Sequence, residues 1–483
     1  MLFRSRLDDD GVHLPETTVP EGRLRIRFSA RLNEVANHAP EPLLGFRLAE
    51  MSFLRPAVRL EGNLREVRDV RAAGRLGQEY TLRLRNRTQQ AQTVDVSLDA
   101  ARLSVFTAEL VPPRVMLSPD GEAVVAARVT APAEAAAALP TLYSEAAAVF
   151  AWAEGDPCGP VPWYCGTLLP RLRGVIPLPD RAPPVLLPAA GADDARDLDA
   201  AGAARLRQEA DAVVDLDPEP PDLVHGNPNR YFNPERNAPL RFHGPGKHWC
   251  EGSRAYVDLA AMPDAVQRAG AYAHHCHLVK AALTLARAGW HLREPRYSRQ
   301  AGVILLAYAR RYRHYPRADE GATGFLSRIG WGVLQESWWY AEIPRAFDLV
   351  RAANVWQPEE VETVRRDLVL EGALTLQAHR SAANQQAEYN RGAGLGALAA
   401  GHSVLAAEAL DGDYGMRAQW RLDFDADGWT VERDAGYQTA ALVPFVDFAR
   451  ALEAAGVPAF DAAFKRLFDA PVRRSRNLVA KPA

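Results

Sequence analysis

The sequence lacks the marks of several protein classes. Four cysteines in 483 residues do not make a disulfide scaffold. The 57 basic residues nearly balance the 60 acidic ones, for a net charge of −3, which argues against a generic nucleic-acid or polybasic membrane binder. No stretch approaches the roughly 18 uncharged apolar residues of a membrane span. Residues 1–10 lack the apolar core of a signal peptide, so we expect a cytoplasmic location if the start is complete.

Alternation of apolar and polar residues at period two marks the first part of the chain as β-rich. It is clearest over residues 60–135, in segments near 80–84, 94–98, 115–117 and 125–129. Turn signals such as Ser118-Pro-Asp-Gly separate these segments. The pattern predicts an antiparallel β-sandwich within a β-rich domain over residues 1–176.

The later part of the chain has a helical period. Residues 177–222 are rich in Pro, Ala and Asp and predict a linker with one short helix around 200–214. The apolar spacing beyond it predicts helices near 263–289, 297–314, 334–353, 358–379, 385–410 and 436–455. Long helices joined by short polar loops predict a bundle or an (α/α) toroid (an incomplete helical barrel) over 223–470, followed by a tail at 471–483.

Three clusters in the helical part carry residues suited to chemistry. One begins Ser381-Ala-Ala-Asn-Gln-Gln and opens a helix. Another, Asp427-Gly-Trp-Thr-Val-Glu-Arg-Asp-Ala-Gly-Tyr-Gln, opens the last predicted helix. The third runs from Gly330-Trp through Glu336, Trp338, Trp339 and Tyr340 to Phe347-Asp348.

The order of these clusters resembles the helical domain of the heparinase II/III and oligoalginate lyase superfamily, over about residues 278–456. These proteins are polysaccharide lyases built on an (α/α) toroid. The resemblance implies an acidic, uronate-containing polysaccharide or oligosaccharide as partner, no cofactor, and cleavage by β-elimination. Its most specific part is Leu410-Asp-Gly-Asp-Tyr-Gly, followed by Asp427-Gly, Glu432 and Gly436-Tyr437.

The lyase reaction explains the residue types. Elimination removes the C5 proton of a uronate and expels the sugar linked at C4, so it needs a neutral donor on the carboxylate, a base near C5 and an acid near the leaving oxygen. By the resemblance, Asn384 neutralises the carboxylate and Tyr437 acts as acid and also as a candidate base. A cation such as Arg433 would favour the phenolate form of Tyr437. The resemblance leaves the base otherwise unassigned, and His379 is the nearest histidine to Asn384 in sequence.

The chain departs from the family pattern at two positions. Gln385 follows the asparagine, where the family often has His or Trp, and Gln438 follows the tyrosine, where it commonly has His. Many members also draw a histidine or tyrosine from a C-terminal β-domain, which we expect to be missing here because the given sequence ends at Ala483. A non-catalytic glycan-binding or assembly protein is therefore the alternative. A third interpretation, a glycoside hydrolase, would use the carboxylates Asp427, Glu432 and Asp434.

Other side chains are candidates for substrate contact. Trp331 and Tyr340 are expected to be the exposed pair of the aromatic cluster and to stack on sugar rings. Arg328 and Arg345 would pair with uronate carboxylates. The candidate substrate-binding residues are Gln385, Arg433, Glu432, Trp331, Tyr340, Arg328 and Gln438.

A histidine-rich region raises the question of a metal site. His243, His248 and Cys250 lie in a predicted loop, and His274 and His277 share one face of a predicted helix with Cys276 nearby. Together they would supply ligands for a structural zinc ion. No CxxC or HExxH spacing accompanies them, so no metal is expected. We expect the loop 225–256 to form the rim of a cleft.

Overall fold

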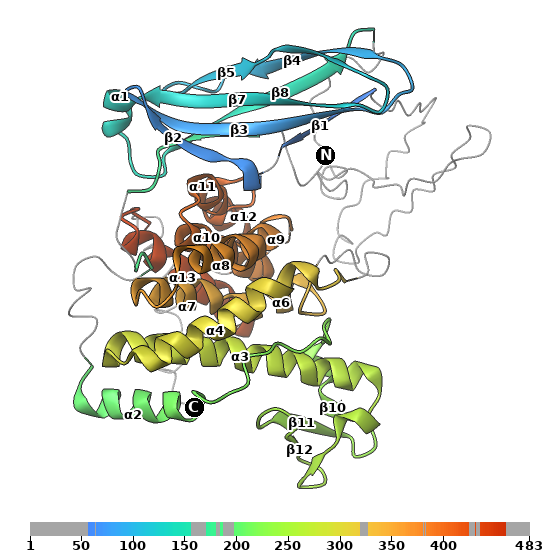
Figure 1. Ribbon diagram of the computed structural model, residues 1–483, viewed down its shortest axis with the longest axis vertical. Helices are drawn as coiled ribbons and strands as arrows, with labels where there is room; N and C mark the ends of the chain where they lie inside the picture. Colours follow the sequence, from blue (N-terminus) through green and yellow to red (C-terminus); the bar gives the residue numbers. More distant parts are fainter. Residues whose placement is uncertain are drawn as a thin grey trace, which may run out of the picture.

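The protein divides into a β-sheet part and a helical part (Figure 1). This computed structural model describes residues 57–62, 64–155, 171–179, 184–186, 198–318, 327–379, 381, 383–424, 430 and 435–459. Antiparallel sheets occupy the first half of the described chain, and helices dominate the second. The expected order of a β-rich region followed by a helical region is confirmed.

Two antiparallel sheets form the first part. One is ordered β1-β3-β7-β5, with β2 also paired to β3, and the other is ordered β6-β4-β8-β9. Burial alternates along the strands, most regularly in β8, so that each sheet has one apolar face. Leu82 of β3, Val96 of β4 and Val125 of β7 lie in the core that the two sheets share. The strands are β1 (Val58–Gly62), β2 (Arg68–Ala72), β3 (Arg75–Asn86), β4 (Gln92–Asp99), β5 (Thr107–Val111), β6 (Arg114–Leu117), β7 (Glu122–Pro132), β8 (Ser144–Ala153) and β9 (Arg171–Val175).

The helices follow the expected segments closely. They are α1 (Ala133–Ala137), α2 (Ala200–Asp211), α3 (Asp264–Leu292), α4 (Pro295–Arg311), α6 (Val333–Tyr340), α7 (Ile343–Ala352), α8 (Pro358–Val364), α9 (Glu371–Gln377), α10 (Ala383–Ala400), α11 (Ser403–Asp411), α12 (Met416–Asp423) and α13 (Ala435–Ala454). A π-helical stretch, Arg365–Leu370, joins α8 to α9. None of the helices in this described set combines the length and apolarity that a bilayer crossing requires.

Two predicted helices are each broken into a pair, the helix predicted at 358–379 contains the π-helical stretch, and neither α1 nor α12 was predicted. The helix expected at 334–353 ends at Tyr340, because Pro344 fits only the first turn of a new helix, where no backbone N–H is needed. The helix expected at 385–410 breaks at Gly401, which adopts a left-handed φ of 69°. His402 then caps α11, since its ring nitrogen accepts from the backbone N–H of Leu405.

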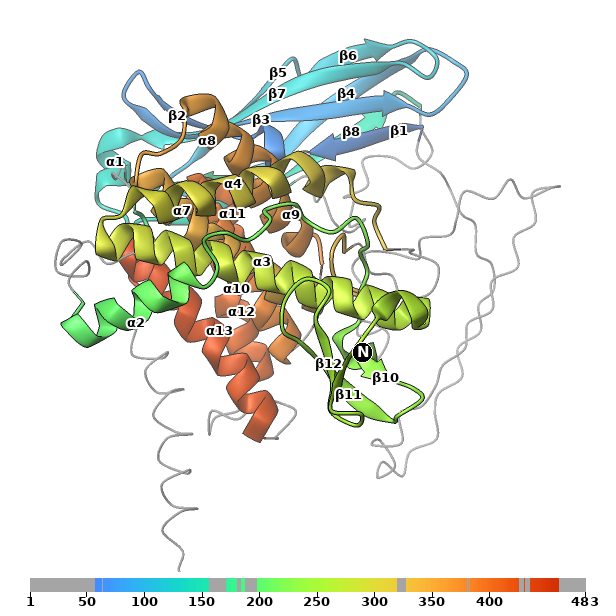
Figure 2. The same cartoon turned by 60° about the horizontal axis from the view of Figure 1, so that its bottom comes forward.

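A small antiparallel sheet lies where the sequence predicted only a loop. Its strands are β10 (Phe232–Asn233), β11 (Ala238–Phe242), β12 (His248–Cys250) and β13 (Ala255–Val257). It packs against α3 on the opposite side of the helical part from the two large sheets (Figure 2). The segment expected to be the rim of a cleft is therefore a folded element.

Buried polar contacts join the large sheets to the helices. Arg65 pairs with Glu371 at the start of α9, and Arg173 of β9 pairs with Glu408 of α11. Ser403 Oγ donates to Asp69 Oδ1 at 2.6 Å. Charges removed from water need close partners, so these contacts fix one end of the helical part against the sheets.

Candidate functional site

The two helices that carry Asn384 and Tyr437 lie in contact. A Cβ added to Gly394 of α10 would come within 2.1 Å of the Phe448 ring of α13, so this glycine permits the close approach. Arg391 Nη1 lies 3.7 Å from Asp447 Oδ2 across the same interface. This ion pair joins the middle of α10 to the second half of α13.

Both helices end at the side of the large sheets. After α10, the His402 ring donates through Nε2 to the backbone oxygen of Leu64, 2.6 Å away. After α13, a Cβ at Gly456 would lie 3.9 Å from Pro179, which follows β9. The helices thus run in the same direction. Asn384 and Tyr437, in the first turn of each, lie at the end away from the sheets, about two to three turns from the ion pair.

The segment before α10 is held by hydrogen bonds to its first turns. Ser381 Oγ donates to Gln385 Oε1 at 3.1 Å, and the Ser381 backbone N–H donates to Gln386 Oε1 at 2.8 Å. Tyr389 OH donates to the same oxygen of Gln385 at 3.4 Å, and burial raises the pKa of Tyr389 to about 12. Gln385 therefore helps to order the chain beside the half-buried Asn384.

His379 follows the end of α9, on the chain leading to Asn384. Its Nδ1 lies 2.9 Å from the backbone oxygen of Thr375. Because a carbonyl only accepts, Nδ1 carries the proton, and Nε2 carries the lone pair of the neutral ring. This tautomer is the one that a base acting through Nε2 requires.

Tyr437 and Gln438 lie next to each other at the start of α13 but have different surroundings. The side chain of Tyr437 is 51% exposed. Gln438 is buried, and its Oε1 accepts a 2.7 Å hydrogen bond from the backbone N–H of Thr430. Gln438 thus orders the chain before α13, while the phenol of Tyr437 is accessible. Glu432 and Arg433, like Asp427 and Asp434, lie outside the described residues.

Behind Asn384, α10 carries two polar networks that the sequence analysis did not identify. In the first, buried Gln386 donates to Asn390 at 3.0 Å, and Asn390 donates to Tyr414 O at 2.8 Å and to Gln419 Oε1 at 3.2 Å. The sequence could have indicated this network, because Gln386 and Asn390 are four residues apart on one predicted helix and so share a face. This network anchors the beginning of α10 to the chain around α12.

The second network is charged. Glu388 lies 2.5 Å from Arg391, and Asp447 pairs with both Arg391 and Arg345 of α7. Burial, opposed by Arg391 and reinforced by Asp447, raises the pKa of Glu388 to about 6. Arg345, expected to bind substrate carboxylates, is instead paired with a carboxylate of the protein.

The aromatic cluster has one exposed residue that was predicted and one that was not. Trp331 is 43% exposed, as expected, but Tyr340 is fully buried and Trp338 is the second exposed ring, at 44%. Tyr340 is buried because its ring and hydroxyl fill the space left by three glycines, and its hydroxyl donates to Val369 O. Those glycines are Gly372, Gly392 and Gly396. The expectation that Tyr340 is exposed to solvent was wrong.

Arg328 also lies in the interior. Its guanidinium donates to Tyr315 O at 2.9 Å, to Arg313 O at 3.1 Å and to Glu371 at 3.3 Å. Glu371 in turn pairs with Arg65 of the sheet part. In this structure Nη1 and Nη2 of Arg328 stabilise a loop and a contact with the sheet part instead of facing solvent.

The histidine-rich region consists of packed rings. Phe242 stacks on His274 at 5.6 Å between ring centroids and contacts His277 at 5.3 Å. His275 is buried between Tyr308 and the backbone oxygen of Leu223, and burial lowers its pKa to about 3. In the described part of the chain, no three His, Cys, Asp or Glu side chains gather to hold a metal ion.

Comparisons with known proteins assign no family. The chain matches no protein-family model and no curated protein. Among solved structures it is similar to native α2-macroglobulin of E. coli, with 14% identity and a TM-score of 0.21 over 87% of this chain. It spans 22% of the length of that protein.

Proposed function

We propose that the helical part is an (α/α) toroid that cleaves a uronate-containing glycan by β-elimination at the end away from the large sheets. The observation that carries this proposal is the parallel packing of α10 and α13, by which Asn384 and Tyr437 come to the same end. The sequence resemblance to polysaccharide lyases gives these two residues their roles.

In this mechanism the amide of Asn384 donates to the substrate carboxylate, which carries more negative charge as the C5–H bond breaks. A neutral donor stabilises that charge without titrating. The electrons of the C5–H bond form the C4=C5 double bond, the C4–O bond breaks, and the Tyr437 hydroxyl protonates the departing oxygen. His379 Nε2 is the proposed acceptor of the C5 proton, with Tyr437 itself as the alternative.

The half-exposed phenol of Tyr437 supports this role, because an acid must reach the leaving oxygen of a large polymer. Beside it, buried Gln438 holds the start of α13 to Thr430. On the other helix, Gln385 and Ser381 order the segment that leads to Asn384. Both functional side chains therefore extend from ordered helix starts, as positioning for catalysis requires.

Ultraviolet absorbance during incubation with a panel of uronate polymers tests the proposal. Elimination leaves a conjugated C4=C5 double bond, and hydrolysis does not. We expect absorbance to rise with at least one polymer and to stay flat for Tyr437→Phe. Equal rates for the two proteins would overturn the mechanism.

A non-catalytic glycan-binding protein is the second candidate. The engaged side chains of Gln385 and Gln438 favour it, since they stand where related lyases commonly have histidines and both stabilise the fold. Retention of the parent protein on a uronate column, without any rise in absorbance and unchanged by Tyr437→Phe, would select this candidate.

A further inference from the structure

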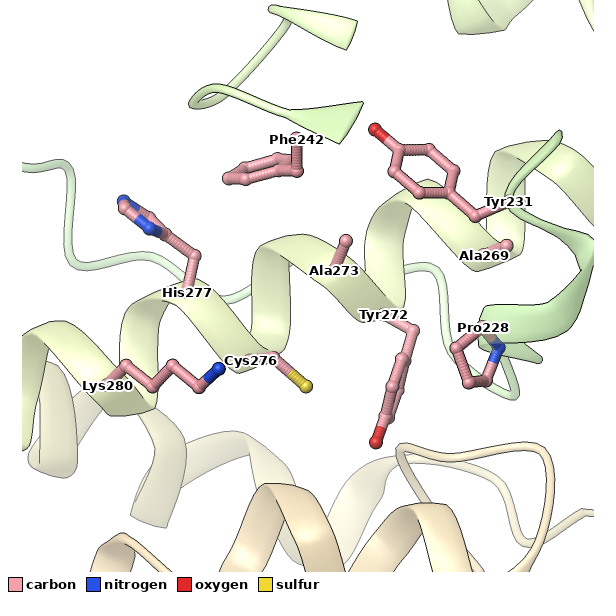
Figure 3. Close-up of a pocket in the computed structure, with 9 residues that line it drawn as sticks. All are labelled: Pro228, Tyr231, Phe242, Ala269, Tyr272, Ala273, Cys276, His277 and Lys280. Atoms are coloured by element: carbon pink, nitrogen blue, oxygen red, sulfur yellow. The ribbon is translucent and has the colours of Figure 1, made fainter. Parts of the chain in front are cut away.

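A cavity lies between the small sheet and α3. Its volume is about 340 Å³, at the small end of the range for ligand sites. It is lined by Pro228, Tyr231, Phe242, Ala269, Tyr272, Ala273, Cys276, His277 and Lys280 (Figure 3). The six residues from α3 are spaced three and one apart, so they form one stripe along nearly three turns of the helix.

Aromatic rings line this cavity, and the short side chains of Ala269 and Ala273 leave its volume open. Phe242 and Tyr231 face α3 from the region of the small sheet, and Tyr272 extends from α3 itself (Figure 3). The hydroxyl of Tyr231 is bonded to His248 Nδ1 at 2.6 Å, and that of Tyr272 donates to Gln335 O at 2.8 Å. With both hydroxyls engaged, the two tyrosines contribute mainly ring faces and edges, which suit the C–H face of a sugar ring.

The charged and polar groups of the cavity are suited to an anion. Lys280 is exposed, and none of the nine lining residues is acidic. Among the described residues, the side chains of Lys280 and His277 have neither a hydrogen bond nor an ion pair with another side chain. Figure 3 shows Lys280 on the side of α3 that carries Cys276 and Tyr272, whereas His277 points to the side of Phe242. An unpaired ammonium attracts a carboxylate and repels a cation.

We propose that this cavity binds a uronate unit, with its ring against Phe242 and Tyr231 and its carboxylate on Lys280. The choice of a uronate rests on the proposed function, since a glycan cleaved elsewhere on the protein carries the same unit. His277, on the side of Phe242, donates a hydrogen bond to a hydroxyl of the sugar ring. The cavity is then a binding site additional to the residues of α10 and α13, and it holds the polymer without cleaving it.

Titration calorimetry with D-glucuronate, glucose and glucose 6-phosphate tests the ligand class. We expect glucuronate to bind, glucose to bind on the order of tenfold more weakly or not at all, and the phosphate to bind no better than glucuronate. Lys280→Met should weaken glucuronate binding on the order of tenfold. The matched control is Lys247→Met, an exposed lysine next to β12, which should bind like the parent. Equal affinity for glucose and glucuronate, or tighter binding of the phosphate, would overturn the assignment.

The location of binding is tested by alkylation of Cys276 and by filling the cavity. Glucuronate should slow modification of the peptide that contains Cys276, as followed by mass spectrometry. Ala273→Leu should abolish binding while retaining the parent's melting temperature within a few degrees. If Cys276 is not protected, or if Ala273→Leu binds normally, the cavity is not the site.

This test is separable from that of the lyase mechanism. Glucuronate binding that depends on Lys280, in a protein without eliminase activity, would sustain the cavity proposal and refute the mechanism. Elimination without glucuronate binding, or with binding that Lys280→Met leaves unchanged, would sustain the mechanism and refute the cavity proposal.

Discussion

The two ends of the helical part differ in what they leave to solvent. At the end facing the large sheets, Arg65 and Arg173 are neutralised by Glu371 and Glu408, and His402 is bonded to a backbone oxygen. At the other end, the first turns of α10 and α13 present half-buried Asn384 and half-exposed Tyr437. One end is closed by satisfied charges, and the other presents polar side chains that are partly accessible to solvent.

This difference separates residues that hold the fold from residues available for function. A buried charge without its partner destabilises the folded state, whereas an accessible polar side chain can be replaced at little cost in stability. Substitutions at the closed end should therefore change the melting temperature, and substitutions at the open end should change activity.

The largest effect is expected at Glu371. Its side chain is 4% exposed and pairs with both Arg65 and Arg328. Glu371→Ala leaves Arg328 buried without a carboxylate and should reduce the free energy of unfolding by about 3–5 kcal/mol, as measured by denaturant titration. Glu362→Ala removes an exposed pair with Arg365 and should cost less than about 1 kcal/mol. Equal losses in the two variants would contradict a closed end held by buried charge.

At the open end, Asn384→Ala should show the opposite behaviour. Loss of one donor to the developing charge should lower kcat by on the order of 100- to 1000-fold, with little change in melting temperature. Asn384→Asp should be at least as inactive, because it places a negative charge against the substrate carboxylate. A variant that keeps parent turnover would exclude Asn384 from the site.

Acid should destabilise the protein through His275. Burial lowers its pKa in the folded state to about 3, below its ordinary value of 6.5 in the unfolded chain. The unfolded state therefore binds the extra proton first, so this contribution to stability is complete above pH 6.5 and is lost as the pH falls toward 3. Between pH 6.5 and pH 5 the loss should reach about 2 kcal/mol. An NMR titration checks the lowered pKa behind this loss, since the His275 ring of the folded protein should stay neutral between pH 6.5 and pH 5.

The last prediction compares a glycine that makes room for the buried ring of Tyr340 with a glycine on an exposed helix. In Gly396→Ala the new Cβ would lie 2.1 Å from the hydroxyl of Tyr340, so overpacking should cost about 1–3 kcal/mol. Gly202→Ala in α2 meets mainly the movable carboxylate of Asp199 and should change stability by less than about 1 kcal/mol. Thermal unfolding of both variants distinguishes the two sites.

Helical periodicity predicted much of this fold, because it reports directly which face of a helix is buried. The helix expected at 263–289 is α3, and that expected at 436–455 is α13, each displaced by only a few residues. The small sheet was missed because its strands are two to five residues long, too short for alternation to be recognised. Helices α1 and α12, with five and eight residues, were missed for a similar reason.

Side-chain environments were less predictable than elements. The burial of Tyr340 depends on Gly372, Gly392 and Gly396, which lie far along the chain and meet it only after folding. Arg328 looked like a candidate carboxylate ligand, but its partner Glu371 follows 43 residues later. Local patterns identify which residues are capable of chemistry, whereas the tertiary partners decide which of them are already occupied.

Product analysis of a uronate oligosaccharide tests the central claim most directly. Mass spectrometry of the cleaved fragments should show one new end that carries a C4=C5 double bond, formed by the parent protein and not by Tyr437→Phe. Fragments that have gained the elements of water, or unsaturated fragments formed equally well by Tyr437→Phe, would contradict elimination at the open ends of α10 and α13.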